Sequence, residues 1–361
     1  MNFQQIERFF EAGKQILKTY GADERWDCRL LHCSENVTFA VTMPETAKDG
    51  EKSEYADSAN NRVEQLSGSE KYVLRVSRPG YHSLPELEAE MEWIQKISED
   101  TSLILASPLV NEEGKRIVRV CADGQIFYGV LRQMLSGEHP GSTGVQTEEE
   151  FEQAGEIAAR LHEQVISWNG SMDLNRPVWD YESMLGSKGL FGDWRACQEL
   201  TEKEQRLLEQ VCCMIRKRLE HYPTDREHFG LIHADLRAAN FLTEHGQMKI
   251  LDFDDCGYGW FLYDLAASVS FLECEPQLGD WIRAWIRGYE KIRLFGSWEY
   301  QEIDTFVMIR RIQLLAWLTS HDDSDPVRWL YEGFAEGTVK LAEKYWKNHN
   351  KSDNIRESRK T

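Results

Sequence analysis

The sequence lacks features that would place it in several other classes of protein. Charged residues interrupt every apolar run before it reaches the roughly 18 residues that a membrane-spanning helix needs. Residues 1–20 carry Glu and Lys within their apolar pattern, which is not typical of a signal peptide. Only 9 of the 361 residues are proline, so a proline-rich linker protein is excluded. We therefore expect a globular chain without a membrane-spanning segment.

Basic residues are also few relative to acidic ones. The chain has 42 Lys and Arg against 61 Asp and Glu, which gives a net charge of −19. Nucleic acids and anionic membranes are bound through positively charged surfaces. We therefore expect neither a nucleic acid nor a membrane as a general partner.

Closely spaced cysteine pairs are absent as well. None of the eight cysteines has the C-x-x-C spacing of a zinc or redox site. Most of them lie among apolar neighbours, where a free thiol behaves as a small hydrophobic side chain. We therefore expect a cytoplasmic protein in a reducing compartment, with neither disulfides nor metal–thiolate sites.

The first third of the chain shows the alternation of a β-sheet. Residues 71–77 alternate between two faces, and residues 117–121 and 125–135 are two further predicted strands joined by a turn at 122–124. Residues 44–70 are polar and poor in apolar side chains, which indicates a mobile polar insert between two strands.

Helical periodicity interrupts these strands once and then dominates the rest of the chain. A capping box formed by Ser83 and Glu86 begins one helix, and a second box formed by Thr147 and Glu150 begins another. Further helices are predicted by apolar residues at spacings of three and four, over residues 202–219, 277–295, 300–319 and 326–346.

The fold class that follows is α+β with two lobes. Residues 1–132 form an N-terminal lobe, which is an antiparallel sheet with one helix. Residues 138–361 form a mostly helical C-terminal lobe, and residues 133–137 join the two as a hinge. A junction of this kind is a usual place for a ligand.

The residues that could carry chemistry lie within positions 230–264. They form the pattern H-x-D-x-x-x-x-N … D-x-D, made of His233, Asp235, Asn240, Asp252 and Asp254. Two short apolar runs flank a turn at His245 and Gly246, which predicts a hairpin that brings Asn240 and Asp252 to one side. Phosphoryl transfer needs a carboxylate that accepts a hydroxyl proton and oxygen ligands that bind Mg²⁺. Each residue alone is typical of a turn, but together they favour a phosphotransferase site.

These motifs resemble those of the aminoglycoside phosphotransferase and choline kinase family, which has a protein-kinase-like fold. The resemblance extends from about Leu31 to Leu272 and is strongest in residues 233–240 and 250–255. It implies a bilobal kinase-like fold and a bacterial type of phosphotransferase.

The resemblance also implies a role for each residue of the pattern. The implied catalytic base is Asp235, and the implied Mg²⁺ ligands are Asn240, Asp252 and Asp254. His233 would brace the catalytic loop, and Asp264 would orient that loop from a following helix.

The same resemblance places nucleotide contacts in the first lobe. Ser34, Asn36 and Thr38 lie where the family keeps a phosphate-covering loop, although this chain lacks the glycines of protein kinases. Arg75 has the strand position of the phosphate-pairing lysine of kinases, and a guanidinium can bind phosphate through two hydrogen bonds. Glu90 would orient Arg75. The alternative is that the two form a surface ion pair of little consequence.

Backbone groups around Gln133 and Leu135 would bind the adenine. The implied cofactors are therefore ATP and Mg²⁺, and the implied reaction moves the γ-phosphate to a hydroxyl of a small molecule. The family's acceptors leave an aminoglycoside, an amino alcohol, homoserine and a sugar-like molecule open. The sequence does not determine the oligomeric state.

Two other functions fit the same residues. A Ser/Thr protein kinase can use this scaffold, and a structural protein can keep the fold without activity. The tryptophans of the second lobe would suit a cationic acceptor through cation–π contacts. Trp281 and Trp285 are, however, spaced as in ordinary helix packing.

Overall fold

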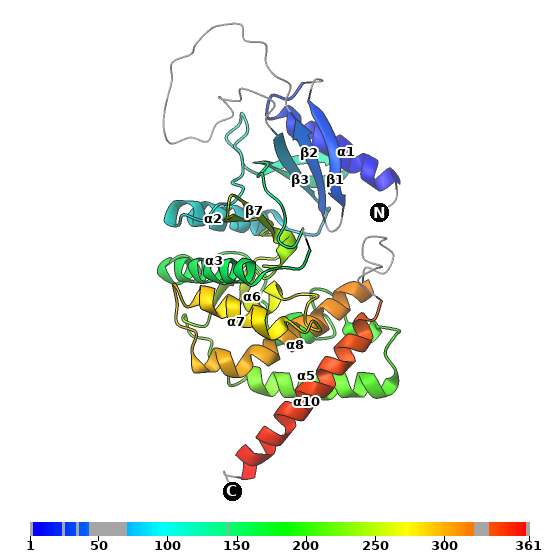
Figure 1. The fold of residues 1–361 in the computed structure, drawn as a ribbon. Coiled ribbons are helices and arrows are strands. Elements are labelled where there is room, and N and C mark those ends of the chain that lie inside the picture. Colours follow the sequence, from blue (N-terminus) through cyan, green and yellow to red (C-terminus); the bar gives the residue numbers. More distant parts are fainter. Residues whose placement is uncertain are drawn as a thin grey trace. The chain divides into compact units, whose positions relative to one another are not determined.

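The computed structural model describes residues 3–23, 26–33, 36–42, 71–142, 144–320 and 332–358. It divides into two compact units (Figure 1): unit 1 is Met1–Gly137 with Lys249–Leu251, and unit 2 is Glu138–Met248 with Asp252–Thr361. Unit 1 holds an antiparallel sheet and unit 2 is mostly helical, so the predicted α+β class is confirmed. The predicted insert at 44–70 and residues 326–331 of the last predicted helix lie outside the described residues.

Unit 1 is built on a five-stranded antiparallel sheet in the order β1-β2-β3-β5-β4. Its strands are β1 (Asp27–Cys33), β2 (Asn36–Thr42), β3 (Lys71–Ser77), β4 (Val118–Ala122) and β5 (Gln125–Gln133). Asp123 and Gly124 connect β4 to β5 with φ angles of 49° and 74°, as a two-residue hairpin turn requires. The strands predicted at 71–77, 117–121 and 125–135 are thereby confirmed.

The two faces of this sheet differ in character. One face packs against helix α1 (Phe3–Lys18), and the core between them includes Phe9, Ile16, Phe39 and Leu74. The opposite face carries Arg75, whose side chain reaches helix α2 (Leu84–Asp100). The capping box that begins α2 at Ser83 is present as predicted. Helix α1 is a second helix in a lobe for which we predicted one; its apolar residues are buried at helical spacing.

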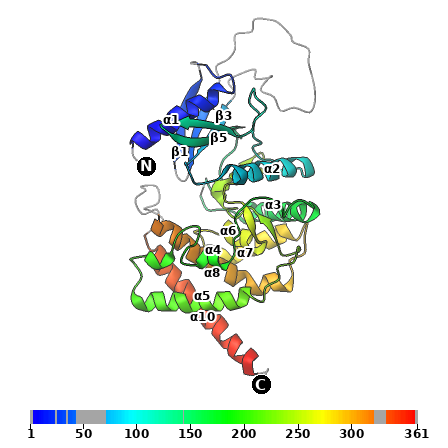
Figure 2. The same cartoon turned by 180° about the vertical axis from the view of Figure 1, so that it is seen from behind.

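Unit 2 is mostly helical and also contains short strands (Figures 1 and 2). Its helices are α3 (Glu148–Ser167), α4 (Tyr181–Leu185), α5 (Glu202–Leu219), α6 (Leu262–Ser268), α7 (Leu278–Tyr289), α8 (Ser297–Ser320) and α10 (Phe334–Ser358). The backbones of helices α3 and α7 are in close contact at Gly155. A side chain there is excluded, because its Cβ would lie 1.9 Å from the carbonyl oxygen of Trp285. No helix in the described ranges is long and apolar enough to cross a bilayer.

Two strand pairs in this part of the chain frame the motif residues. Strand β6 (Phe229–Ile232) pairs with β9 (Gly257–Trp260), and β7 (Phe241–Glu244) pairs with β8 (Gln247–Ile250). His245 and Gly246 connect β7 to β8, both with positive φ (52° and 79°). The predicted hairpin is therefore confirmed, and it begins directly after Asn240 and ends two residues before Asp252.

Candidate active site

The loop between β6 and β7 holds Asp235 and is hydrogen-bonded to helix α6. Asp264 of α6 is fully buried and accepts hydrogen bonds from the backbone N–H groups of His233 (3.2 Å) and Ala234 (2.8 Å). Ala234 has a φ of 67°, a left-handed conformation that costs a non-glycine residue about 1–2 kcal/mol. Asp264 supports this conformation, because it binds the N–H of Ala234 itself and that of the residue before it.

A buried histidine holds Asp264 in turn. His162 of α3 contacts Oδ2 of Asp264 through Nε2 (3.1 Å) and the hydroxyl of Tyr289 through Nδ1 (3.0 Å). Burial lowers the pKa of His162 and outweighs the attraction of Asp264, so the ring is neutral. In the neutral ring Nε2 donates to the carboxylate and Nδ1 accepts from Tyr289. Sequence analysis did not find His162, because it looks like one polar residue on an otherwise apolar helix face.

Asp235 is surrounded by donors. Its Oδ2 accepts from Nδ2 of Asn240 (2.7 Å) and Nε of Arg237 (3.1 Å), and its Oδ1 accepts from Nη2 of Arg310 on α8 (2.5 Å). Burial alone would raise the pKa of Asp235, but the charges of Arg237 and Arg310 outweigh it and lower the pKa below its ordinary value. Asp235 is therefore an anion at neutral pH, which is the state a proton acceptor needs.

The loop after β8 brings further carboxylates to the same region. Asp252 is exposed and has a φ of 52°, and Asp254 is buried. Burial raises the pKa of Asp255 well above its ordinary value, and the charges of Asp235, Asp254 and Asp252 raise it further. The charge of Asp235 therefore acts on the loop after β8, which links the two acidic parts of the predicted motif electrostatically.

A segment that we did not predict fixes this acidic loop. Arg176 donates to the carbonyl oxygens of Cys256 (2.6 Å) and Asp254, and Nε1 of Trp179 donates to that of Asp255 (2.8 Å). Three consecutive carbonyls are thus held by donors from one short stretch of chain. The positions of the carboxylates are therefore set by the backbone.

The donor set suits a magnesium ion bound together with phosphates. Asn240 directs Nδ2 at both the carbonyl and Oδ2 of Asp235, and within the described residues its Oδ1 has no hydrogen bond. That amide oxygen and the exposed carboxylate of Asp252 are hard ligands of the kind Mg²⁺ takes. The described residues contain no group of three or more His, Cys, Asp or Glu arranged as a metal cage. A metal held by one or two protein ligands, with phosphates and water completing its shell, needs no such cage.

In unit 1, Glu90 binds two arginines. Its Oε2 lies 2.5 Å from Nη2 of Arg75, and its Oε1 lies 2.7 Å from Nη2 of Arg132. Glu90 is fully buried and both arginines are nearly so, which excludes the surface pair that we considered as an alternative. Arg132 is opposite Val73 in the sheet and therefore shares a face with Arg75. Sequence analysis missed Arg132, although an arginine at the end of an apolar strand is a signal of a buried partner.

Two other residues of unit 1 that we predicted to contact the nucleotide lie in strand β2. Asn36 and Thr38 belong to β2, opposite Ser77 and Arg75 of β3, so the expectation that they form a loop is wrong at these positions. Both side chains point to the face that carries Arg75, because residues directly opposite in a sheet share a face. Ser34 lies outside the described residues.

At the end of β5 successive residues direct their backbone N–H and C=O groups to alternate sides of the strand. The N–H of Met134 donates to the carbonyl oxygen of Lys71 on β3 (2.9 Å). Because successive residues of a strand direct their backbone groups to opposite sides, those of Gln133, the last residue of β5, point away from β3. Such groups can bind the edge of a planar ring.

A mutation of Glu90 tests the buried pairing. We expect Glu90→Gln to lower the free energy of unfolding by about 3 kcal/mol, because two buried guanidinium groups lose their shared negative charge. Urea denaturation measures this change. Glu92→Gln, at an exposed position of the same helix, is the matched control and should change stability by less than about 0.5 kcal/mol. Equal stabilities of Glu90→Gln and the wild type would contradict the pairing.

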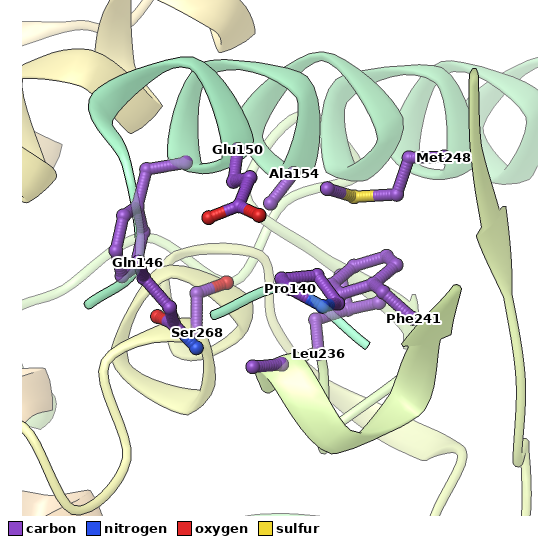
Figure 3. Close-up of a pocket in the computed structure, with 10 residues that line it drawn as sticks. Pro140, Gln146, Glu150, Ala154, Leu236, Phe241, Met248 and Ser268 are labelled. Carbon is purple, nitrogen blue, oxygen red and sulfur yellow. The ribbon is translucent and has the colours of Figure 1, made fainter. Parts of the chain in front are cut away.

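One small cavity adjoins the catalytic loop (Figure 3). Its volume is about 10 Å³, and its lining includes Glu150, Leu236, Phe241 and Ser268. Figure 3 shows the oxygen atoms of Glu150 and Ser268 on one side and the ring of Phe241 on the other. A space of this size holds one water at most.

Known proteins that are similar to this chain are phosphotransferases and kinases. A family model described as "Phosphotransferase enzyme family" matches residues 53–306. The solved structure of the microcompartment-associated aminopropanol kinase is 31% identical and has a TM-score of 0.79, covering 94% of this chain and 98% of that one. Amicoumacin kinase of Bacillus subtilis (strain 168) is 26% identical over 254 residues, which are 69% of this chain and 71% of that protein. A second amicoumacin kinase, solved with AMP-PNP and Ca²⁺, has a TM-score of 0.69 at 19% identity, covering 94% of this chain and 96% of that one.

The fold and the motif define a phosphotransferase with a protein-kinase-like architecture. This chain belongs to the phosphotransferase enzyme family. It is a kinase that transfers a phosphoryl group to an alcohol group, so the family and the fold implied by the sequence are confirmed. The alternative of a structural protein without activity is not supported.

Proposed function

We propose that this chain is an ATP- and Mg²⁺-dependent kinase whose acceptor is a small amino alcohol. The observation that carries the phosphotransfer is the environment of Asp235, an anionic carboxylate held by three donors beside the acidic loop. The acceptor class is supported by the aminopropanol kinase that is 31% identical to nearly the whole chain.

In this proposal Asp235 accepts the proton of the acceptor hydroxyl. The hydroxyl oxygen forms a bond to the γ-phosphorus of ATP, the bond from that phosphorus to the β–γ bridging oxygen breaks, and ADP leaves. Mg²⁺, when bound, neutralises charge on the phosphates. Asn240 and Asp252 would hold it, with Asp254 as a further ligand.

Unit 1 would contribute the nucleotide contacts. Arg75, oriented by Glu90, is a fixed cation that can bind phosphate through two hydrogen bonds. Asn36 and Thr38 on the neighbouring strand, together with Ser34, would contact the phosphates as well. The backbone groups of Gln133 and Leu135 would bind the adenine, within the predicted hinge at residues 133–137.

A cationic acceptor suits the charges around Asp235. The carboxylates of Asp252 and Asp254, close in sequence to each other, would make the region acidic, which favours an ammonium group. Trp281 and Trp285 do not supply this recognition, because both are buried, as helix packing predicts. Recognition of the amine would therefore rest on carboxylates.

An acceptor screen tests the proposal. ADP release is measured with aminopropanol, ethanolamine, homoserine, an aminoglycoside, N-acetylglucosamine and a protein mixture, and ³¹P NMR locates the new phosphate. We expect turnover with the amino alcohols. Propanediol, which has the hydroxyl without the amine, is the matched control and should react at least a hundredfold more slowly. Phosphate found on protein, or on sugars alone, would contradict the proposed acceptor.

A further inference from the structure

Arg310 is a buried arginine whose charge is directed at the active site. It lies on α8, is 2% exposed, and donates through Nε to the hydroxyl of Ser270 (2.9 Å). Its Nη1 donates to the hydroxyl of Tyr263 (3.0 Å) and to the carbonyl oxygen of Ala234 (3.4 Å). Its Nη2 donates to Oδ1 of Asp235 (2.5 Å). Four polar contacts thus fix the guanidinium in one orientation.

Among the described residues, Asp235 is the one carboxylate that is hydrogen-bonded to Arg310. The other three acceptors are two hydroxyls and a carbonyl, all of them neutral. A buried guanidinium is costly unless a negative charge compensates it. A protein that needed only packing at this position would gain from an apolar side chain. The arrangement therefore indicates that the charge serves Asp235.

The two oxygens of Asp235 are held differently. Oδ1 accepts from the buried Arg310, whose side chain is 3% exposed, whereas Oδ2 accepts from the buried Asn240 and from Arg237, whose side chain is 38% exposed. A long, partly exposed side chain can give way to an incoming molecule, while a buried one bound at four points cannot. When Arg237 gives way, Oδ2 keeps the hydrogen bond from Asn240 and has an acceptor position open, so it is the oxygen that an acceptor hydroxyl can reach.

We propose that Arg310 is a positioning residue of the phosphotransfer: by anchoring Oδ1 from within unit 2, it presents Oδ2 of Asp235 to the acceptor hydroxyl. Tyr263 and Ser270 support it by fixing the guanidinium. The contact to the carbonyl of Ala234 adds a hold on the strained residue before Asp235. This inference rests on the proposed role of Asp235 as the proton acceptor.

The neighbouring residue provides a matched control. Arg311 is also buried, and it donates to Glu273 (2.8 Å), Thr338 (2.9 Å) and the carbonyl oxygen of Phe334 (2.9 Å). It thus has the same side chain, on the same helix, with a buried carboxylate of its own. It differs from Arg310 in that none of these hydrogen bonds goes to Asp235 or its loop.

The test is the steady-state kinetics of the full chain with ATP and an acceptor from the screen. We expect Arg310→Met to lower kcat at least a hundredfold and to change the KM for ATP less than threefold. Arg310→Lys should have a kcat at least tenfold higher than that of Arg310→Met, since an ammonium keeps the charge beside Oδ1. Arg311→Met should keep kcat within threefold for the folded fraction, as measured by circular dichroism.

Several results would overturn the proposal. The first is a kcat of Arg310→Met within threefold of the wild type. The second is an equal loss of kcat in Arg310→Met and Arg311→Met. If Arg310→Met does not fold, Tyr263→Phe takes its place, because it removes one anchor of Arg310 and should lower kcat about fivefold at constant KM; an unchanged kcat would overturn the proposal. An active Asp235→Asn enzyme would instead refute the proposed function, so the two failures are distinguishable.

Discussion

Replacing Asp235 with asparagine is expected to lower kcat about a thousandfold while the affinity for ATP changes less than threefold. General base catalysis contributes about 10²–10⁴ to a rate, and the amide cannot accept the proton. The amide keeps the size of the carboxylate and leaves Asn240 and Asp252 in place, so the nucleotide and metal sites should persist. Steady-state kinetics and calorimetric titration of ATP measure the two quantities.

The control must separate chemistry from folding. Asparagine at position 235 leaves Arg310 without its carboxylate, so we expect a lower melting temperature, and kcat is to be referred to the folded fraction. Asp225→Asn, an exposed carboxylate beside His228, should leave kcat unchanged. An Asp235→Asn enzyme with wild-type turnover would reject the role of Asp235.

The second large effect is expected at the metal. Asp252→Ala should weaken the binding of ATP in the presence of Mg²⁺ at least a hundredfold, because Asp252 is the exposed carboxylate among the proposed ligands of the metal. Binding of ATP in EDTA should be the same in the variant and the wild type. Calorimetry under the two conditions gives both constants.

Two further variants locate the metal effect. Asp280→Ala, an exposed carboxylate on α7 paired with Arg283, should bind ATP as the wild type does in both conditions. Asp254→Ala should show a smaller loss with Mg²⁺, about tenfold, since its carboxylate is buried. If Asp252→Ala bound ATP with undiminished affinity in Mg²⁺, the metal assignment would be wrong.

Local patterns in the sequence were sufficient for the elements that carry the site. The capping box at Ser83, the alternation of residues 71–77 and the turn at His245 each depend on neighbours within a few positions, and all three are present. The motif from His233 to Asp254 lies within one short segment, so its residues come together through one hairpin and one loop.

The support of the site is long-range, and the sequence could not show it. Asp235 and Arg310 are 75 positions apart, and His162 and Asp264 are 102 positions apart. A charged residue within an apolar helix, such as Arg310 in α8, indicates that a buried partner exists. It does not indicate which partner, because that depends on how the helices of unit 2 pack.

Helix α1 is a different kind of omission. Its apolar residues Phe9, Ala12 and Ile16 recur at spacings of three and four and pack on the sheet. The signal was therefore present in the sequence. The charged residues of this segment, which are not typical of a signal peptide, lie on the exposed face of the same helix.

The central claim is that Asp235 receives the acceptor's proton beside a metal bound by Asn240 and Asp252. A crystal structure of the full chain with Mg²⁺, a non-hydrolysable ATP analogue and an acceptor from the screen tests it most directly. We predict that the acceptor hydroxyl lies within about 3.2 Å of Oδ2 of Asp235. The metal should lie about 2.1 Å from oxygens of Asn240 and Asp252. A hydroxyl placed against another carboxylate, or a metal bound away from both ligands, would contradict the account.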